Sequence, residues 1–336
     1  MWHIGLDVHQ MQSTICILDK NGKRIRRQTI RGRWDILIAE LRKIKKPFAI
    51  CFEASTGYGY LFEQLSKIAK RVLVAHPGQL RLIFRSKRKN DRVDAEKLAK
   101  LLYLDAVPTV YVPSVDIRSW RSTIEHRQQL IRERTRTKNA IRALLRTHGI
   151  ASPRRLWSKS NLKWLSALTF PTSLYALQRD MLLERYHSLA PLIERTEAAL
   201  EKIANAHPGV NLLMTIPGVG IRTAEAVVAY IDKPERFTKN KAIGRYFGVI
   251  PCQDASAGAN RLGHITRDGP STVRKVIAEA AWQGIRRSSH IRAYFERIQQ
   301  KKKERRKIAL VATAHYLLRV MLAMLQTGET WRYTAA

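Results

Sequence analysis

Four carboxylates in the first hundred residues occupy positions where they could hold metal ions. Asp7 and Glu53 each close a short apolar run, and Asp91 and Asp94 lie three residues apart, which places them on one face of a helix. Carboxylate oxygens are the ligands that Mg²⁺ prefers, with Mn²⁺ accepted in its place. Two such ions about 4 Å apart can clamp a phosphodiester. The set therefore predicts a phosphoryl-transfer site, whereas each acid alone would indicate only a helix cap or a solvated surface.

The elements around these acids predict an RNase H-like fold for residues 1–107. Three strand-like runs come first, and the Asn21-Gly22 dipeptide between the second and third predicts a type I′ hairpin turn, so these strands are antiparallel. Helical and strand patterns then alternate, over residues 34–44, 48–52, 60–69, 72–75 and 91–103. A doubly wound Rossmann domain would not begin with a tight hairpin. In an RNase H-like sheet the first and fourth strands are neighbours and the last helix crosses them, so the four carboxylates would converge.

Residues 108–205 predict a long helical hairpin. Residues 114–148 and 173–203 have helical patterns, and the first of them is very basic. Apolar residues on a seven-residue repeat give a weak coiled-coil signal, namely Ile117, Ile124, Ile131 and Leu145. Lys138 breaks this repeat, and Arg127 and Arg134 occupy the partner seam. The region is expected to protrude and to offer a surface for a second protomer.

Residues 206–336 predict a third, mainly helical domain with a helix-hairpin-helix-like element. The stretch 215–230, TIPGVGIRTAEAVVAY, contains Gly218 and Gly220 just before a helical pattern. Glycines allow a tight turn, and the N–H groups of such a turn and of the next helix can bind a phosphate. The alternative is an ordinary packing element, and a phosphate contact would carry no sequence specificity.

Residues 252–275, CQDASAGANRLGHITRDGPSTVRK, combine hydroxyls and cations in a glycine-rich stretch that predicts a loop or irregular hairpin. Arg261, Arg267 and Arg274 are expected to contact nucleic acid, and His264 is a candidate base or phosphate contact. Ser271 and Thr272 are expected to cap the following helix. Cys252 is a weaker candidate nucleophile because no partner base adjoins it.

The charge of the chain points to a polyanionic partner. The 336 residues include 61 Lys and Arg against 27 Asp and Glu, a net charge of +34, while a 45% hydrophobic content excludes wholesale disorder. Such an imbalance is unusual for a metabolic enzyme, and nucleic acid is the leading partner. The three cysteines have no zinc spacing, which suggests a reducing compartment. Residues 308–325 are apolar but interrupted by His315 and Arg319, so we expect a buried helix, no membrane association and a cytoplasmic protein.

These motifs resemble those of the DEDD transposases of one bacterial insertion-sequence family, also called bridge-RNA-guided recombinases. The matching segments are GLDVH, CFEASTGYG, KNDRVDAEKLA, IPGVGIRTA, YFGVIP and GHITRDGPSTVRK, and they cover nearly the whole chain in the family's order. The resemblance implies a RuvC-like domain at residues 1–107 and a serine-bearing transposase domain at residues 206–336. It also implies donor and target DNA, a structured guide RNA from the same element, and a dimer or tetramer.

The resemblance assigns the nucleophile to Ser256, which would form a phosphoserine intermediate with DNA. Thr266 matches a position where family members often carry serine, and is the rival hydroxyl. The chain has Ala257 where the family often has a second glycine. Arg261 and Arg267 are candidates to stabilise the transition state. The sequence leaves open whether His264 or the metal ions activate Ser256.

Two other functions remain compatible with the sequence. A RuvC-like, Mg²⁺-dependent nuclease that hydrolyses branched DNA would use the same four acids and leave Ser256 structural. A protein that only packages RNA or DNA would account for the charge but not for four ordered acids. Covalent protein–DNA adducts distinguish the first reading, a DNA recombinase, from both alternatives.

Overall fold

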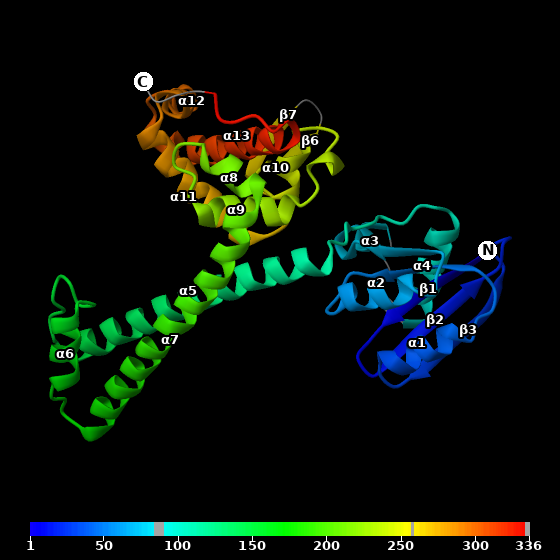
Figure 1. Cartoon of the computed structure of the whole chain (residues 1–336), viewed down its shortest axis with the longest axis horizontal. Coiled ribbons are helices and arrows are strands. Elements are labelled where there is room, and N and C mark those ends of the chain that lie inside the picture. The colour runs from blue at the N-terminus through cyan, green and yellow to red at the C-terminus, as the bar shows by residue number, and fades with distance from the viewer. Residues whose placement is uncertain (84–90, 257–258, 333–336) are drawn as a thin grey trace. The chain divides into compact units, whose positions relative to one another are not determined.

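The computed structural model describes residues 1–83, 91–256 and 259–332, with side chains at all of these except 91–92 and 254–260. The chain separates into two units, residues 1–115 and 116–336 (Figure 1). The first is a mixed α/β unit and the second is mostly helical, as the sequence predicts. The finer division at residues 107 and 205 stays a prediction.

Unit 1 is built on a five-stranded sheet in the order β3-β2-β1-β4-β5. The strands are β1 (Trp2–Val8), β2 (Gln12–Leu18), β3 (Arg24–Arg31), β4 (Phe48–Glu53) and β5 (Arg71–Ala75). β1 pairs antiparallel with β2, and β2 with β3, whereas β1, β4 and β5 run parallel to one another. The predicted meander of three strands and the predicted contact of the first and fourth strands are therefore confirmed.

Helices cover the two faces of this sheet, and strand alternation explains which residues meet them. Even-numbered residues of β1 and β4 form an apolar core with α1 (Trp34–Arg42) and α2 (Tyr58–Ser66). Odd-numbered residues face α4 (Asp91–Tyr103), and they include Gly5 and Cys51. A short helix, α3 (Pro77–Ile83), follows β5. Asp7 and Glu53 are odd-numbered, so they belong to the face that α4 covers.

The hairpin between β2 and β3 differs from the type I′ turn that the sequence predicts. Gly22 has a φ of +78°, but Asn21 does not have the positive φ that such a turn requires. The Gly22 N–H donates to the Asp19 carbonyl, and the Asp19 carboxylate accepts from the N–H groups of Asn21 and Lys23. The Asp19 side chain thus holds an ordinary turn ahead of a single left-handed glycine.

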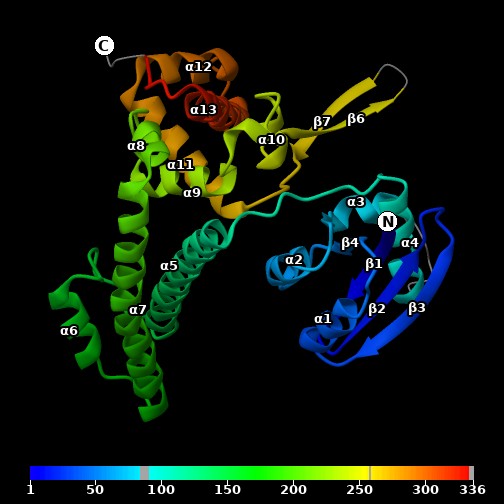
Figure 2. The ribbon, with the colours of Figure 1, turned by 45° about the vertical axis from the view of Figure 1, so that its right-hand side comes forward.

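Unit 2 begins with the predicted helical hairpin, formed by α5 (Val115–Thr147) and α7 (Ser173–Ala206), with α6 (Lys159–Ala167) packed beside it (Figure 2). Ile124 and Leu145 of the apolar repeat are buried. Arg127, which breaks the apolar seam, is paired with Glu197 of α7 through its Nε at 2.7 Å and through Nη2. An ion pair thereby replaces an apolar contact in the seam.

The rest of unit 2 is a helical core with one two-stranded ribbon. Its helices are α8 (Pro208–Met214), α9 (Ile221–Ile231), α10 (Ala242–Tyr246), α11 (Ser271–Arg287), α12 (Ser289–Gln299) and α13 (Arg306–Thr327), and 3-10 turns occupy Pro234–Arg236 and Lys303–Arg305. β6 (Pro251–Ser256) and β7 (Ala259–Ile265) form the antiparallel ribbon, which projects from the helices (Figure 2). The loop or irregular hairpin predicted over residues 252–275 is, within the described residues, an antiparallel ribbon with a register irregularity between Pro251 and Gln253, followed by α11.

α13 is the apolar helix that the sequence predicts to be buried. By length and composition the segment Lys303–Thr327, which has a mean hydropathy of 1.8 over 18 consecutive residues, could cross a membrane, and it is the one such segment in the described part of the chain. Leu317, Leu318, Met321 and Leu322 are fully buried in the core of unit 2. A core helix of a helical domain accounts for this hydropathy.

A polar network fixes the base of the hairpin to the helical core. Arg121 of α5 donates to the Ala229 and Tyr230 carbonyls at the end of α9, and Glu125 accepts from the hydroxyls of Tyr230 and Thr272, each at 2.8 Å. Burial and the nearby Glu125 carboxylate raise the pKa of the Tyr230 hydroxyl. The expectation that Thr272 caps α11 is wrong, because that helix has Pro270 at its cap without a side-chain cap bond and Thr272 donates to Glu125 instead.

Candidate active site and nucleic-acid interface

Asp7 and Glu53 come to the same edge of the sheet in unit 1. β1 and β4 are parallel and their last described pair is Leu6 with Phe52, so extending this register by one residue sets Asp7 beside Glu53. Both side chains belong to the face that α4 covers, because side chains alternate along a strand. Two strands that are far apart in the sequence thus bring two of the four predicted ligands to neighbouring positions.

The contacts of α4 with β1 show where the other two acids lie along the helix. The ring of His3 contacts that of Tyr103 near the end of α4, at 5.5 Å between centroids. A Cβ on Gly5 would lie 2.0 Å from the Ala95 carbonyl oxygen and 2.3 Å from the Ala99 nitrogen. Because the helix runs opposite to the strand, two further residues of β1, about 6.6 Å, correspond to about four residues of helix. Asp7 is therefore level with the first turn of α4, which begins at Asp91.

The acids at this edge have few basic neighbours. Among the described residues, the Nε2 of His9 lies 3.4 Å from Asp7 Oδ2, and the Nζ of Lys97 lies 3.3 Å from Asp94 Oδ1. Glu53 is exposed and has no ion pair within the described residues. Glu96 differs, because Arg24, Arg27 and Lys100 surround its carboxylate and lower its pKa. Glu96 is a structural ion-pair centre that ties α4 to β3.

His9 is a site residue that the sequence reasoning did not assign. It follows Asp7 by two residues, so strand alternation returns it to the same face, and this spacing within GLDVH was the available signal. The indole N–H of Trp34 donates to the His9 carbonyl at 3.0 Å. Trp34 in turn stacks on Tyr60 of α2, at 6.1 Å between centroids. These contacts fix the backbone just beyond Asp7.

The described acids do not by themselves form a closed metal site. Within the described side chains, no three His, Cys, Asp or Glu residues converge on one point. Asp91, one of the four predicted ligands, has its side chain outside the described set. The donor chemistry still fits Mg²⁺, because Asp7, Glu53 and Asp94 carry carboxylate oxygens on three elements that share one face of the sheet. These residues, with Asp91, would hold the ions.

Ser256 is the last described residue of β6, where the ribbon reaches its tip. Its backbone is paired with Ala259 of β7, and its side chain lies outside the described set. Arg261 is two residues from Ala259, so the positions of Ser256 and Arg261 share one face of the ribbon.

The length of the ribbon separates Ser256 from His264, the candidate base, and from Arg267, a candidate to stabilise the transition state. His264 is five residues beyond Ala259, about 16 Å along the strand at 3.3 Å per residue, and Arg267 is farther still. Neither can touch a phosphate held by Ser256 of the same chain while the ribbon is straight. Thr266, the rival hydroxyl, also lies at the far end, with its Oγ1 buried and without a hydrogen-bond partner in the described structure.

The far end of the ribbon is held by backbone contacts and by Arg274. Arg267 adopts a φ of +59°, and Gly248 packs so tightly on Asp268 that a Cβ would lie 2.3 Å from its backbone atoms. Arg274 Nη1 donates to the carbonyls of Phe247 and Gly269, at 3.2 and 3.0 Å, and to that of Asp268. Desolvation lowers the pKa of Arg274. Arg274 therefore supports the loop, and its contact with nucleic acid stays a prediction.

The two glycines of the predicted phosphate-binding element differ in their surroundings. Gly218 has a φ of +90°, and a Cβ on it would lie 2.4 Å from the nitrogen of Gly284 in α11. This glycine is required for helix packing, which fits the alternative that the sequence left open. Gly220 is exposed at the start of α9 and has open space around its Cα. Only Gly220 has the exposure that a phosphate contact needs.

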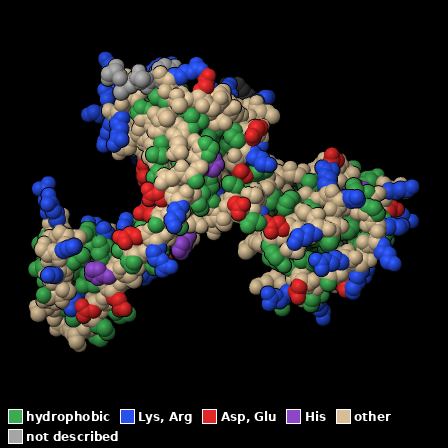
Figure 3. All heavy atoms as spheres, viewed as in Figure 1, with side chains coloured by type: hydrophobic (Ala, Val, Ile, Leu, Met, Phe, Trp, Pro, Cys, Tyr) green, Lys and Arg blue, Asp and Glu red, His purple; other side chains and the backbone are tan. Residues whose placement is uncertain are grey.

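Basic side chains are spread over the visible face of both units (Figure 3). The edge strand β3 carries four arginines, and Arg24 and Arg26 are exposed. Charged residues on an edge strand prevent pairing with other sheets, and they also attract a phosphate backbone. This distribution agrees with the polyanionic partner that the composition predicts.

Comparison with known proteins agrees with this architecture. A family model for DEDD transposases of the IS110 type, described as "Transposase", matches residues 4–150, and one described as "Transposase IS116/IS110/IS902 family" matches residues 210–296. The transposase for insertion sequence element IS1111A of Coxiella burnetii is 24% identical over 341 residues, covering 98% of this chain and 91% of the relative. The transposase for insertion sequence element IS1328 of Yersinia enterocolitica is 23% identical over 282 residues, covering 83% and 82%.

A DEDD-type α/β unit followed by a helical transposase domain defines the class: the chain is a transposase, an enzyme that acts on DNA. It belongs to the IS110/IS1111 family of insertion-sequence transposases. The resemblance inferred from the sequence motifs is confirmed at this level.

Proposed function

We propose that this transposase cuts and rejoins DNA through a covalent phosphoserine at Ser256, with Asp7, Glu53, Asp91 and Asp94 as Mg²⁺ ligands. The observation that carries the proposal is the alignment of Asp7 with Glu53 at neighbouring strand ends, on the face where α4 begins with the other two acids. The strand order supports an RNase H-like, RuvC-type domain. A hydrolytic nuclease would need only the four carboxylates and not the Ser256 hydroxyl.

Bound Mg²⁺ or Mn²⁺ would polarise the scissile phosphate and stabilise the charge that develops on the attacking and leaving oxygens. The chain's own contribution is to hold four carboxylates on one side of the sheet. His9 beside Asp7 keeps a hydrogen-bond donor at the rim of the site. The indole N–H of Trp34 donates to the His9 carbonyl, and this hydrogen bond fixes the end of the strand that carries Asp7.

The transfer step exchanges one phosphodiester for another. Ser256 Oγ forms a bond to the phosphorus, the bond from phosphorus to the leaving sugar oxygen breaks, the serine hydroxyl gives up its proton and the leaving oxygen gains one. Reversal by a sugar hydroxyl from another strand rejoins the DNA, and the phosphodiester energy is conserved in the ester. Arg261 shares the face of Ser256 and can neutralise the phosphate. His264 is five residues along β7 from Ala259, so it does not reach a phosphate bonded to Ser256 of the same chain while the ribbon is extended.

We further propose that an RNA encoded with the transposase gene guides it to DNA, and that the active form is a dimer or tetramer. The charge of +34 supports a second polyanion besides the DNA substrate. Recombination requires several strand cuts, and one chain offers one Ser256. Purified protein should therefore carry RNA, and RNase treatment should abolish recombination. Full recombination after RNase treatment would contradict RNA guidance without affecting the serine proposal.

The test of the serine is denaturing electrophoresis of the protein with end-labelled DNA, followed by peptide mapping of the attached residue. Wild-type protein with Mg²⁺ should give an adduct that maps to Ser256, and Ser256→Ala should give neither adduct nor recombinant DNA. The matched control is Thr266→Ala, which should weaken the reaction without ending adduct formation.

Two outcomes would overturn the proposal. An adduct that persists in Ser256→Ala, or that maps to Thr266, moves the nucleophile. Cleavage by wild-type protein without any adduct favours the hydrolytic nuclease, in which Ser256 is structural.

A further inference from the structure

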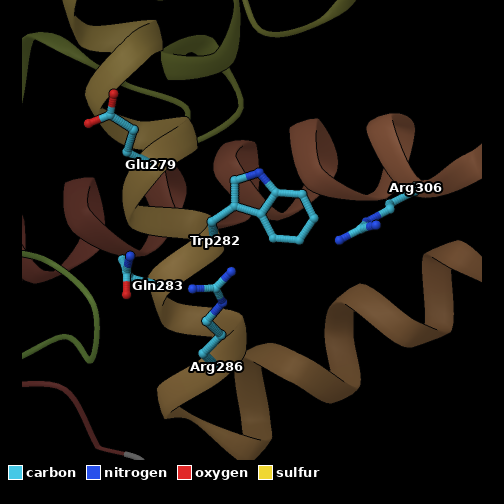
Figure 4. Close-up of a pocket in the computed structure, with 5 residues that line it drawn as sticks. All are labelled: Glu279, Trp282, Gln283, Arg286 and Arg306. Carbon is cyan, nitrogen blue, oxygen red and sulfur yellow. The ribbon is translucent and has the colours of Figure 1, made fainter. Parts of the chain in front are cut away.

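The helical core of unit 2 contains a small cavity that none of the proposed machinery uses. It has a volume of about 280 Å³ and lies between α11 and α13, lined by Glu279, Trp282, Gln283, Arg286 and Arg306 (Figure 4). Ligand sites of small molecules measure about 300–1,000 Å³, so this cavity is at the lower end of that range. Its size suits one planar group rather than a large cofactor.

Trp282 packs against the edge of the hydrophobic core of unit 2 but is only partly buried. The buried residues of α11 include Val273, Ile277 and Ala281, whereas the cavity-lining residues 279, 282, 283 and 286 follow an i, i+3, i+4, i+7 pattern on a more exposed face. Trp282 is only half-buried, and its neighbour on that side is Phe295 of α12, at 5.9 Å between ring centroids. A large aromatic ring on the polar side of a helix is a signal for recognition.

Two arginines flank the indole and are available to bind an anion. The Cζ of Arg306 lies 4.8 Å from the centre of the Trp282 ring, and Figure 4 shows the indole between Arg286 and Arg306. Both guanidinium groups belong to exposed residues without an ion pair to any described acid. The nearby Arg292 differs, because its guanidinium donates to the Ile285 and Arg286 carbonyls and closes the end of α11. Neither cavity arginine donates such a hydrogen bond within the described residues, although the Arg306 guanidinium lies over the face of the indole.

The chemistry of the cavity matches an unpaired nucleotide. An aromatic ring stacks on any base, arginine planes extend such a stack and bind phosphate, and Glu279 and Gln283 offer an acceptor and an amide to a base edge. Arg306 belongs to the run 301–307, which has six Lys or Arg residues and one Glu, so further positive charge adjoins the cavity for a nucleic-acid strand to contact. A base pair inside a duplex could not enter, because its faces are covered by its neighbours.

We propose that this cavity, the Trp282 site, binds single-stranded nucleic acid by taking one unstacked base against the indole while Arg286 and Arg306 hold the adjacent phosphates. The inference rests on the proposed function only in that nucleic acid is the ligand. A displaced DNA strand and an unpaired segment of RNA share this chemistry, so the experiment includes both.

The test measures binding of the full-length protein to labelled 12-nucleotide DNA and RNA strands, to the same strands with abasic sites at every second position, and to the corresponding duplex. Trp282→Leu removes the ring and keeps an apolar side chain, and should weaken binding of one or both intact strands about 5- to 100-fold. It should leave duplex binding within about twofold and remove the preference for intact over abasic strands. The strand that loses affinity identifies whether DNA or RNA occupies the site.

Arg306→Gln should weaken strand binding and reduce its salt dependence. The matched control is Arg297→Gln, because Arg297 lies 5.0 Å over the Tyr294 ring outside the cavity. An unchanged circular dichroism spectrum confirms that each variant folds, and Trp282→Phe, which keeps an aromatic face, should retain most of the affinity.

Three results separate the possible failures. If Trp282→Leu binds intact strands as tightly as wild type, or loses strand and duplex binding equally, the Trp282 site is wrong. If the intact and abasic strands bind wild type equally, no base enters the cavity and the proposal is again wrong. If wild type binds neither strands nor duplex, the proposed function itself fails.

Discussion

Gly5→Ala tests whether the packing of α4 on β1 builds the acidic site. The Cα of Gly5 faces the backbone of α4, so a Cβ would lie 2.0 Å from the Ala95 carbonyl oxygen and 2.3 Å from the Ala99 nitrogen. Ordinary contact begins at 3.4 Å, and helix backbone cannot rotate away as a side chain can. The helix must therefore retreat by about 1.4 Å.

This retreat should have two measurable effects. Overpacking of a core contact costs about 1–3 kcal/mol of unfolding free energy. The first turn of α4 would also move away from Asp7, and a displacement of about 1 Å at a catalytic site can cost about a hundredfold in rate. We expect urea unfolding, followed by circular dichroism, to show the loss of stability, and DNA strand cleavage to fall at least a hundredfold while DNA binding persists.

The control is Gly78→Ala in α3 of the same unit, where a Cβ would meet only the His76 side chain at 3.2 Å. This variant should change both stability and cleavage little. If Gly5→Ala keeps wild-type stability, the close approach of α4 is wrong. If its stability falls but cleavage is unchanged in the folded protein, α4 does not position catalytic acids.

Asp7→Asn and Glu53→Gln should each abolish cleavage and leave DNA binding nearly intact, because they remove metal ligands; activity of either variant, or of wild type in excess chelator, would contradict the acidic site. Glu125→Leu should lower the unfolding free energy of unit 2 by about 1–3 kcal/mol in urea, since it leaves two buried hydroxyls without an acceptor, whereas the exposed Glu194→Leu should not. Burial lowers the pKa of His207, whose Nδ1 accepts from the Gly209 N–H, so stability is greatest above the unfolded pKa of 6.5 and falls as pH drops toward the folded value. His207→Asn keeps the cap, and should flatten that decline in urea titrations between pH 7 and 5; an unchanged slope would refute the assignment.

Buried polar contacts also join α7 of the hairpin to α9 of the helical core. Glu225 is almost fully buried on α9, and burial raises its pKa although Arg222 lies 3.1 Å from both of its carboxylate oxygens. Arg222 also reaches the Glu197 carbonyl of α7 at 3.2 Å. Buried polar contacts of this kind fix one relative orientation of α7 and α9 more strictly than apolar packing does.

Much of the fold followed from local patterns. Short apolar runs located the strands of unit 1, helical spacing of apolar residues located the long helices of the hairpin, and the order of elements implied that β1 and β4 are neighbours. The pairing of Asp7 with Glu53 could be anticipated because parallel strands must align their carboxyl ends. The turn at Asn21-Gly22 could not, since the Asp19 side chain, rather than the dipeptide, selects its geometry.

The sequence by itself determined the transposase family and predicted the class of chemistry, from four acids near element ends, a hydroxyl in a glycine-rich stretch and a large positive charge. Only the tertiary structure decided which groups can cooperate. The register of β6 and β7 separates Ser256 from His264 and Arg267, although all three lie within twelve residues of sequence, because an extended strand lengthens by about 3.3 Å per residue. Packing likewise places Gly218 against the backbone of α11 and makes Thr272 a hydrogen-bond donor to Glu125. It also leaves Trp282 half-exposed beside two arginines. Residue types name the chemistry, but long-range contacts between helices and strands set the distances on which it depends.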